Sequence, residues 1–197
     1  MNIKPFIIAT TSAVFCCLVS ACGGGSSSST SEEVSCGDAG ATTLEEGIAG
    51  DFSDDIANPT SWTLGAGTNV LRASTTSGDS DYVAFTVGPC DTLDSISVTD
   101  FTPTGNDLIA FMALQQGSTF TIPAAEASTG SRIDELLGYS HYGTANLNQD
   151  ILPLIGQGPG SIGFTAPLNT GTYTTWLHQT GTETQFTLVF YVSRVVP

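Results

Sequence analysis

Apolar and polar residues alternate along several segments of this chain, and this period of two constrains its fold more than any other feature. Along 83–87 valine and phenylalanine occupy every second position, and along 186–192 phenylalanine, leucine and valine do the same. Because successive side chains of a β-strand point to opposite faces, the alternation predicts strands with at least one buried face.

Turn-forming residues interrupt the alternating segments about every ten residues, a spacing typical of an all-β fold. We predict an antiparallel β-sandwich or jelly roll of about eight or nine strands with one long irregular insert. The strands are expected near 61–64, 69–75, 81–87, 92–99, 107–115, 118–122, 161–165, 172–178 and 184–193. The last two should form a closing hairpin that turns at Gly181. The insert spans 123–160, with helical turns expected at 131–137, capped by Ser131, and at 150–155.

The N-terminus has the pattern of an export signal. Lys4 precedes a mostly apolar run over 6–19, which is too short to span a bilayer and fits a signal-peptide core. The run ends in Val-Ser-Ala-Cys at 19–22, which resembles a lipobox. This resemblance implies cleavage after residue 21 and acylation of Cys22. An ordinary secretory signal with an incidental cysteine is the alternative.

A glycine- and serine-rich stretch follows the cysteine and predicts a flexible tether over 22–35. The globular domain is then expected over 36–197. Gly23 rather than aspartate follows Cys22, and by resemblance to Gram-negative sorting patterns this favours the outer membrane, on either its periplasmic face or the cell surface. More than one acyl chain would be needed for stable attachment.

The chain is strongly acidic, with 19 Asp and Glu residues against 4 Lys and Arg and a formal charge of −15. Such a surface repels nucleic acid and anionic lipid headgroups, so no nucleic-acid partner is expected. It suits cations, although acidic residues at this density also serve solubility alone.

Two cysteines remain after the signal and the anchor cysteine are set aside. Cys36 and Cys90 are expected to pair as a disulfide in an oxidising compartment. Two free thiols or a metal pair are the alternatives, and the absence of a neighbouring histidine disfavours zinc.

Several segments together resemble the small β-sandwich modules related to the bacterial pre-peptidase C-terminal domain. These segments are 50–60 (GDFSDDIANPT), 78–87 (GDSDYVAFTV), 120–123 (FTIP), 137–143 (LGYSHYG) and 171–176 (GTYTTW). The resemblance covers most of 45–193. It implies a non-catalytic module, since such modules are usually appendages of secreted proteins, and some bind calcium or polysaccharide.

Aspartates form the sharpest candidate site. Those near the start of the domain and those flanking the turn before the 81–87 strand could converge on one hard cation, and calcium is the expected cofactor. The candidate ligands are Asp51, Asp54, Asp55, Asp79 and Asp81. The alternative is that these residues are ordinary turn formers that bond their own backbone.

Aromatic residues suggest a second candidate site. Tyr139, His141, Tyr142 and Trp176 could form a stacking platform for a polysaccharide. The alternative reading places Trp176 in the core of the sandwich.

No catalytic constellation is recognisable in the sequence. A Gly-x-Ser-x-Gly elbow is missing, and the glycine pattern at 158–163 lacks the strand and helix that a phosphate loop requires. The expected function is therefore a non-enzymatic envelope lipoprotein with a binding or adhesion role. A carbohydrate-binding module and a structural subunit of an envelope or filament assembly are the alternatives.

Overall fold

The computed structural model describes residues 36–37, 39–106, 108–179 and 181–195. The predicted signal peptide, Cys22 and the tether lie outside the described residues. Along the described part of the chain, none of the helices is both long enough and apolar enough to cross a membrane.

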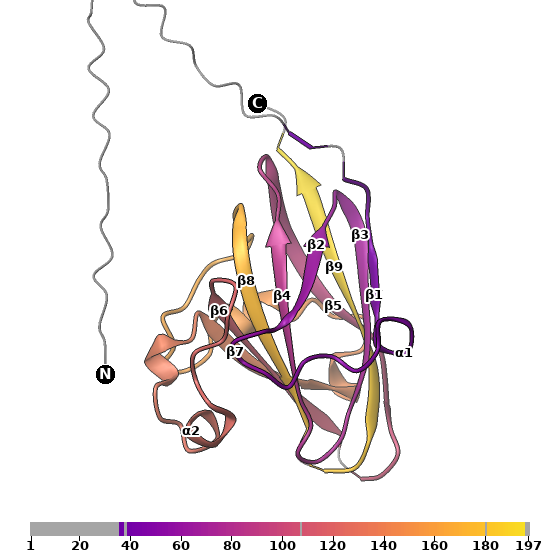
Figure 1. Ribbon diagram of the computed structural model, residues 1–197, viewed down its shortest axis with the longest axis vertical. Coiled ribbons are helices and arrows are strands. Elements are labelled where there is room, and N and C mark those ends of the chain that lie inside the picture. The colour runs from indigo at the N-terminus through magenta and orange to yellow at the C-terminus, as the bar shows by residue number, and fades with distance from the viewer. Residues whose placement is uncertain (1–35, 38, 107, 180, 196–197) are drawn as a thin grey trace, which may run out of the picture. The chain divides into compact units, whose positions relative to one another are not determined.

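Within the described residues, nine strands form two sheets that pack face to face, as predicted (Figure 1). One sheet has the order β1 (Thr43–Glu45), β3 (Gly67–Thr75), β9 (Thr184–Arg194) and β5 (Asp91–Pro103). The other has the order β2 (Thr60–Leu64), β4 (Ser80–Val87), β8 (Gly171–His178), β6 (Ile109–Gln116) and β7 (Gly138–Gly143). The prediction of an all-β sandwich is confirmed.

The sheets are mixed rather than purely antiparallel. β1 pairs with β3, and β2 pairs with β4, in parallel. In each case the strand between the two partners in the sequence lies in the opposite sheet. The chain runs back along the opposite sheet between the two partners. The second partner therefore starts at the same end of the sandwich as the first, and the two strands run parallel.

The predicted alternation locates the core correctly. Phe85 and Phe190 are fully buried between the sheets, and their rings meet edge to face with centroids 5.4 Å apart. Trp62 of β2 closes the core against Phe190, with centroids 5.1 Å apart. Apolar side chains from both inner faces therefore form one continuous core.

Two predicted strands are absent, and two short strands were not foreseen. Phe120 and Ile122 of the predicted strand 118–122 pack over the outer face of the five-stranded sheet as a cover and do not pair as a strand. The segment 161–165 is also irregular. The unforeseen strands, β1 and β7, are short and rich in polar or glycine residues, and they form only because a long neighbouring strand offers them a free edge.

The predicted closing hairpin is wrong, because β8 and β9 belong to different sheets. The chain after β8 crosses from one sheet to the other, and Gln179 forms a bridge with Ser77 in the equivalent crossing between β3 and β4. Alternation on two consecutive strands cannot distinguish a hairpin from such a crossing.

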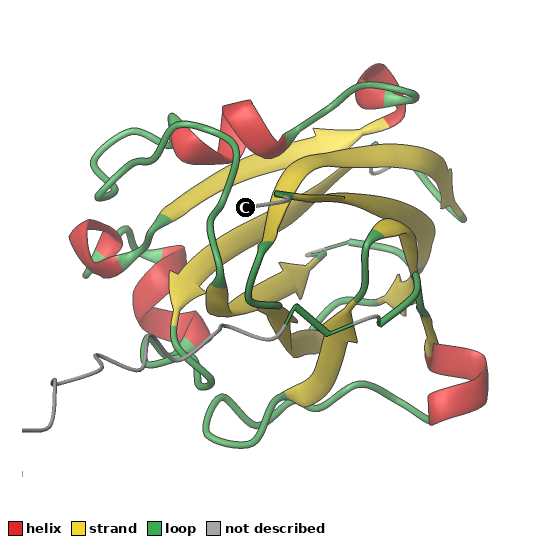
Figure 2. Ribbon diagram, turned by 90° about the horizontal axis from the view of Figure 1, so that it is seen from above, coloured by secondary structure: helices red, strands yellow, loops and turns green. Residues whose placement is uncertain are grey.

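Short helices lie at the margins of the sheets (Figure 2). They are α1 (Glu46–Ala49), α2 (Ala124–Ser128), η1 (Ile133–Glu135), η2 (Thr144–Asn146) and α3 (Leu152–Gly156). η1 and α3 coincide with the two predicted helical turns, although Arg132 rather than Ser131 takes the N-cap position of η1. Pro153 lies in the first turn of α3, where its missing N–H costs no helical hydrogen bond.

The predicted disulfide is present between Cys36 and Cys90, with Cα atoms 5.6 Å apart. Beside it, Arg194 Nε lies 3.1 Å from Asp91 Oδ1, and the guanidinium also donates to the carbonyl of Gly37. These residues, Cys36, Gly37, Cys90, Asp91 and Arg194, are called the disulfide end below.

Asn69 joins the edge of the four-stranded sheet to the turn before β3. Its buried Oδ1 accepts from the backbone N–H groups of Thr42 and Gly65, at 2.9 and 3.0 Å, and its Nδ2 donates to the carbonyl of Gly65 at 2.8 Å. We expect Asn69→Ala to lower the free energy of unfolding by about 2–3 kcal/mol, because it leaves these buried backbone groups unpaired. Urea unfolding measures the loss. A change below about 0.5 kcal/mol, the level of an ordinary surface substitution, would contradict this role.

Candidate metal centre

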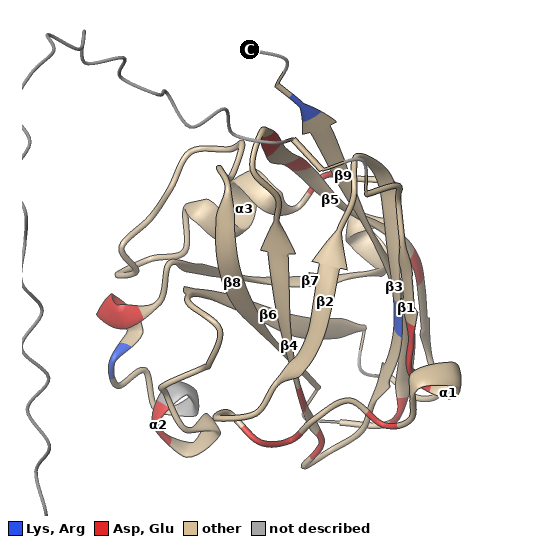
Figure 3. Cartoon of the chain, turned by 45° about the horizontal axis from the view of Figure 1, so that its top comes forward, with Lys and Arg blue, Asp and Glu red and all other residues tan. Residues whose placement is uncertain are grey.

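Three carboxylates converge at the end of the sandwich opposite the disulfide end. Glu46 begins α1, Asp51 follows that helix, and Asp81 lies near the start of β4. One carboxylate oxygen from each lies within 4.8 Å of the others. Figure 3 shows acidic residues along the segments at the lower end of the sheets, where α1 and the start of β4 are found.

The alternation of β4 places Asp81 in the interior. Val83, Phe85 and Val87 all face the core, so Asp81 occupies the first inward position of the same strand. Asp81 is fully buried, and among the described residues neither its Oδ1 nor its Oδ2 has a hydrogen-bond partner. A buried carboxylate without a partner is costly, because it has lost its hydration and gained nothing in return.

Burial and neighbouring negative charges disfavour ionisation of Asp81. Burial is the largest cause, followed by the charges of Asp79 and Glu46, and together they raise the pKa of Asp81 to about 8. In the absence of a cation the group therefore gains a proton near neutral pH.

Glu46 is held at the edge of the four-stranded sheet by β3. Its Oε2 accepts from the backbone N–H of Ser74 and, at 3.0 Å, from the Ser74 hydroxyl. Partial burial is the main cause that raises the pKa of Glu46, and the adjoining carboxyl of Asp51 raises it further. The repulsion between two neighbouring carboxylates disfavours the ionisation of both, and a shared proton or a cation between them would relieve it.

Two of the other predicted ligands lie near this group but bond to the backbone. Asp54 Oδ1 accepts from the N–H of Ser80 at 3.1 Å, and Asp79 Oδ2 accepts from the N–H of Thr76 at 3.3 Å. Burial and the charges of Asp51 and Asp54 raise the pKa of Asp79. We call Glu46, Asp51, Asp54, Asp79 and Asp81 the acidic end.

Asp55 is an ordinary turn residue, as the alternative to a metal ligand proposed. Its Oδ1 accepts from the N–H of Ala57 at 2.9 Å, and its Oδ2 accepts from Asn58 Nδ2 at 2.7 Å. These bonds lower the pKa of the exposed Asp55 carboxyl. The structure therefore brings Asp51 and Asp81 together and leaves Asp54 and Asp79 beside them, whereas the Asp55 carboxylate bonds within its own turn.

Each of the three arginines pairs with a carboxylate outside the acidic end. Arg72 Nη1 lies 3.3 Å from Glu45, Arg132 binds Glu135 and Glu126, and Arg194 binds Asp91. Within the described residues, no ion pair between an arginine and the acidic end is found. His178 is a basic residue beside this end: its Nδ1 lies 2.8 Å from the carbonyl oxygen of Asp79, and its charge lowers the pKa of Asp79. Protons or an external cation would have to balance the remaining negative charge.

The predicted aromatic platform is divided between the two faces of the sheet. Tyr142 points into the main core, where its ring meets Phe101 and Phe186 and only 1% of the residue is exposed. Tyr139 and His141 lie on the opposite face of β7, around Phe111. The four residues predicted together do not share one surface.

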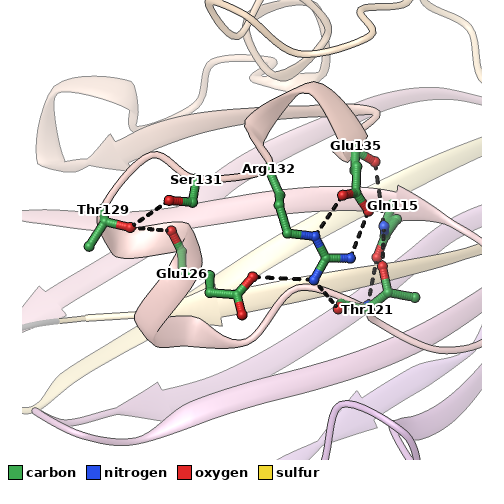
Figure 4. A network of polar contacts seen from close by, with 7 residues as sticks. All are labelled: Gln115, Thr121, Glu126, Thr129, Ser131, Arg132 and Glu135. Atoms are coloured by element: carbon green, nitrogen blue, oxygen red, sulfur yellow. Dashed lines mark hydrogen bonds and ion pairs between the residues drawn. The ribbon is translucent and has the colours of Figure 1, made fainter.

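Trp176 is covered by the segment between β6 and η1. It is 3% exposed and lies against Phe120, in a second small core on the outer face of the five-stranded sheet. Figure 4 shows the polar network that holds this cover, in which Arg132 binds both oxygens of Glu135, at 2.6 and 2.7 Å, and also the carbonyl of Thr121. Trp176 is therefore buried, but beneath this cover and not in the core between the two sheets, so the structure matches neither the exposed platform nor the sandwich-core alternative.

A groove of about 400 Å³ adjoins the acidic end on the outer face of the four-stranded sheet. Its walls are mainly polar and include Glu45, Glu46, Arg72, Asp100 and Gln185. This groove lies next to the carboxylate group, and none of the four predicted aromatic-platform residues is among those that line it.

Glu46 is the site residue that the sequence did not reveal. Glu46 comes close to Asp81 because β1 pairs in parallel with β3, and no short sequence pattern predicts this long-range pairing. Asp81 was predicted as a candidate ligand beside the turn, and its place in the alternating series with Val83 and Phe85 is consistent with its inward direction.

No known protein family, characterised protein or solved structure matches this chain. The resemblance to pre-peptidase C-terminal modules therefore stays a prediction.

Proposed function

We propose that this chain is a non-catalytic, lipid-anchored module of the cell envelope that presents its acidic end to an extracellular partner. The observation that carries the proposal is the opposition of the two ends. β4 runs from the acidic end to the disulfide end, and its eight residues span about 25 Å. A tether that ends at Cys36 would attach to the domain at the disulfide end, so the acidic end lies at the other end of the sandwich from the point of attachment.

The disulfide supports an exported location, because such bonds persist mainly in oxidising compartments. It also ties the start of the domain to the residues that follow β4. The tether would therefore attach to a rigid part of the sandwich, which favours display of the opposite end.

The charge and the groove together indicate the chemistry of the partner. The acidic end repels anionic lipid headgroups and nucleic acid, whereas a basic or cation-bearing surface would be attracted to it. The neighbouring groove of about 400 Å³ offers a concave polar surface for such a contact.

Site-specific photo-crosslinking in cells tests this function. A photoreactive residue at Asp55, which is exposed beside the acidic end, should give adducts. The same residue at Asn169, which is also exposed and lies close to Gly171, the partner of Val87 near the disulfide end, is the matched control and should give few adducts. Equal labelling at both positions, or none at position 55, would contradict the proposal.

The adducts also distinguish the alternatives. A glycan adduct would favour carbohydrate binding, and a ladder of the chain crosslinked to itself would favour a structural subunit of an assembly. The anchor is tested separately by Cys22→Ser, which should abolish labelling by palmitate and release the protein from the membrane fraction. Continued labelling of this variant would disprove lipidation at Cys22.

A further inference from the structure

Building on the function proposed above, we propose that Glu46, Asp51 and Asp81 bind a calcium ion at the acidic end. The three ligands come from separate parts of the chain, two from the segment of α1 and one from the inner face of β4. The site thus joins the N-terminal segment to the rim of the five-stranded sheet.

The spacing of the carboxylates fits one shared cation. Calcium binds oxygen at 2.3–2.6 Å, so two oxygens on the same ion lie at most about 5 Å apart. The oxygens of Glu46, Asp51 and Asp81 meet this limit, since they lie within 4.8 Å of one another. No rearrangement of the backbone is therefore required to bring them onto one ion.

Asp81 supplies an observation that is independent of the clustering. Aspartates at a surface are common without a metal, but a fully buried carboxylate with two unpartnered oxygens is rare. One of its oxygens lies within 4.8 Å of oxygens of Glu46 and Asp51, and the described part of the chain provides it with no hydrogen-bond donor. A cation would satisfy its oxygens directly.

The ligand atoms favour calcium over other metals. All three are carboxylate oxygens, which suit hard cations, and neither cysteine nor histidine belongs to the group. Magnesium demands near-ideal octahedral geometry and keeps several waters, whereas calcium accepts irregular sets of six to eight oxygens. Asp51 is exposed, so water and nearby carbonyls can complete the shell.

Calcium at this position would fix the segment 46–55 against the sandwich. Glu46 already contacts β3 through Ser74, and Ser53 forms a bridge with Tyr82 of β4. The ion would add a link to the inner face of β4 through Asp81. The partner-facing end would then be ordered by calcium, which makes partner binding sensitive to the ion.

Titration calorimetry and thermal unfolding of the purified full chain, in detergent and after treatment with EDTA, test the site. Calcium at about a hundred times its dissociation constant should raise the unfolding temperature by roughly 5–10 °C. Magnesium at the same concentration should give a much smaller shift. Asp81→Asn and Asp51→Asn should each weaken calcium binding at least tenfold. Asp134→Asn, the same change at an exposed position, should leave it intact.

Asp51→Asn keeps the test sound if Asp81→Asn disturbs folding, because Asp51 is exposed and outside the core. The proposal is overturned if the unaltered chain shows neither heat nor a thermal shift, if magnesium binds equally well, or if the Asp51 variant binds calcium as tightly as the unaltered chain. Failure of the proposed partner-binding function would appear instead as missing crosslinks at position 55 in a chain that binds calcium.

Discussion

In metal-free buffer at pH 7, Asp81→Asn should make the protein more stable, by on the order of 4 kcal/mol. The unaltered carboxyl has an ordinary pKa of 3.8 in the unfolded chain, and burial among Asp79 and Glu46 raises that pKa to about 8 in the folded protein. At neutral pH, folding must therefore take up a proton or bury a charge. Asparagine carries no charge and removes this cost.

The same difference in pKa fixes the sign of the pH dependence. Below about pH 4 Asp81 is protonated in both states, and it contributes no penalty. As the pH rises toward about 8, the unfolded chain loses its proton first, so the free energy of unfolding falls. Above about 8 the full penalty is present.

Urea unfolding between pH 4 and 9 in EDTA measures both effects. The unaltered protein should lose stability across this range, and Asp81→Asn should show a much flatter profile. Asp134→Asn is the matched control and should follow the unaltered protein. Parallel profiles for the unaltered chain and Asp81→Asn would show that Asp81 does not titrate in this range.

The second large effect concerns the disulfide. Replacement of Cys36 and Cys90 by serine should lower the free energy of unfolding by about 4 kcal/mol, because the bond closes a loop with a sequence separation of 54. For a domain of this size, the unfolding temperature should fall by roughly 8–16 °C.

Reduction of the unaltered protein provides the control for this prediction. Thermal unfolding with a strong reductant should lower its transition to that of the double-serine variant, and the variant itself should not respond. A variant as stable as the oxidised protein would contradict the stapling role. The pairing of Asp91 with Arg194 beside the bond should then weaken as well.

The alternation of apolar residues was enough to predict the sandwich and most of its strands. It works for β4 and β9 because Phe85 and Phe190 face a core that both sheets share. The alternation gave a wrong prediction where apolar residues are buried without belonging to a strand. Phe120 and Ile122 cover the outer face of a sheet, so their apolar character indicates packing but not strand pairing.

The candidate site was predictable only in part, for a related reason. Aspartates beside turns indicated a cation, yet the sequence could not separate Asp55, which bonds to its own turn, from Asp51, which reaches across to Asp81. Glu46 joins the group through a long-range strand pairing. The aromatic platform failed because adjacent residues, such as His141 and Tyr142, point to opposite faces of β7.

One measurement tests the central claim of a calcium site most directly. Crystals grown in calcium, or soaked in a lanthanide that replaces it, should show one strong anomalous peak at the acidic end. We predict that oxygens of Glu46, Asp51 and Asp81 lie about 2.3–2.6 Å from this peak. A map with no peak at these three residues, at a calcium concentration that saturates a millimolar site, would contradict the claim and leave the buried carboxyl of Asp81 to protons alone.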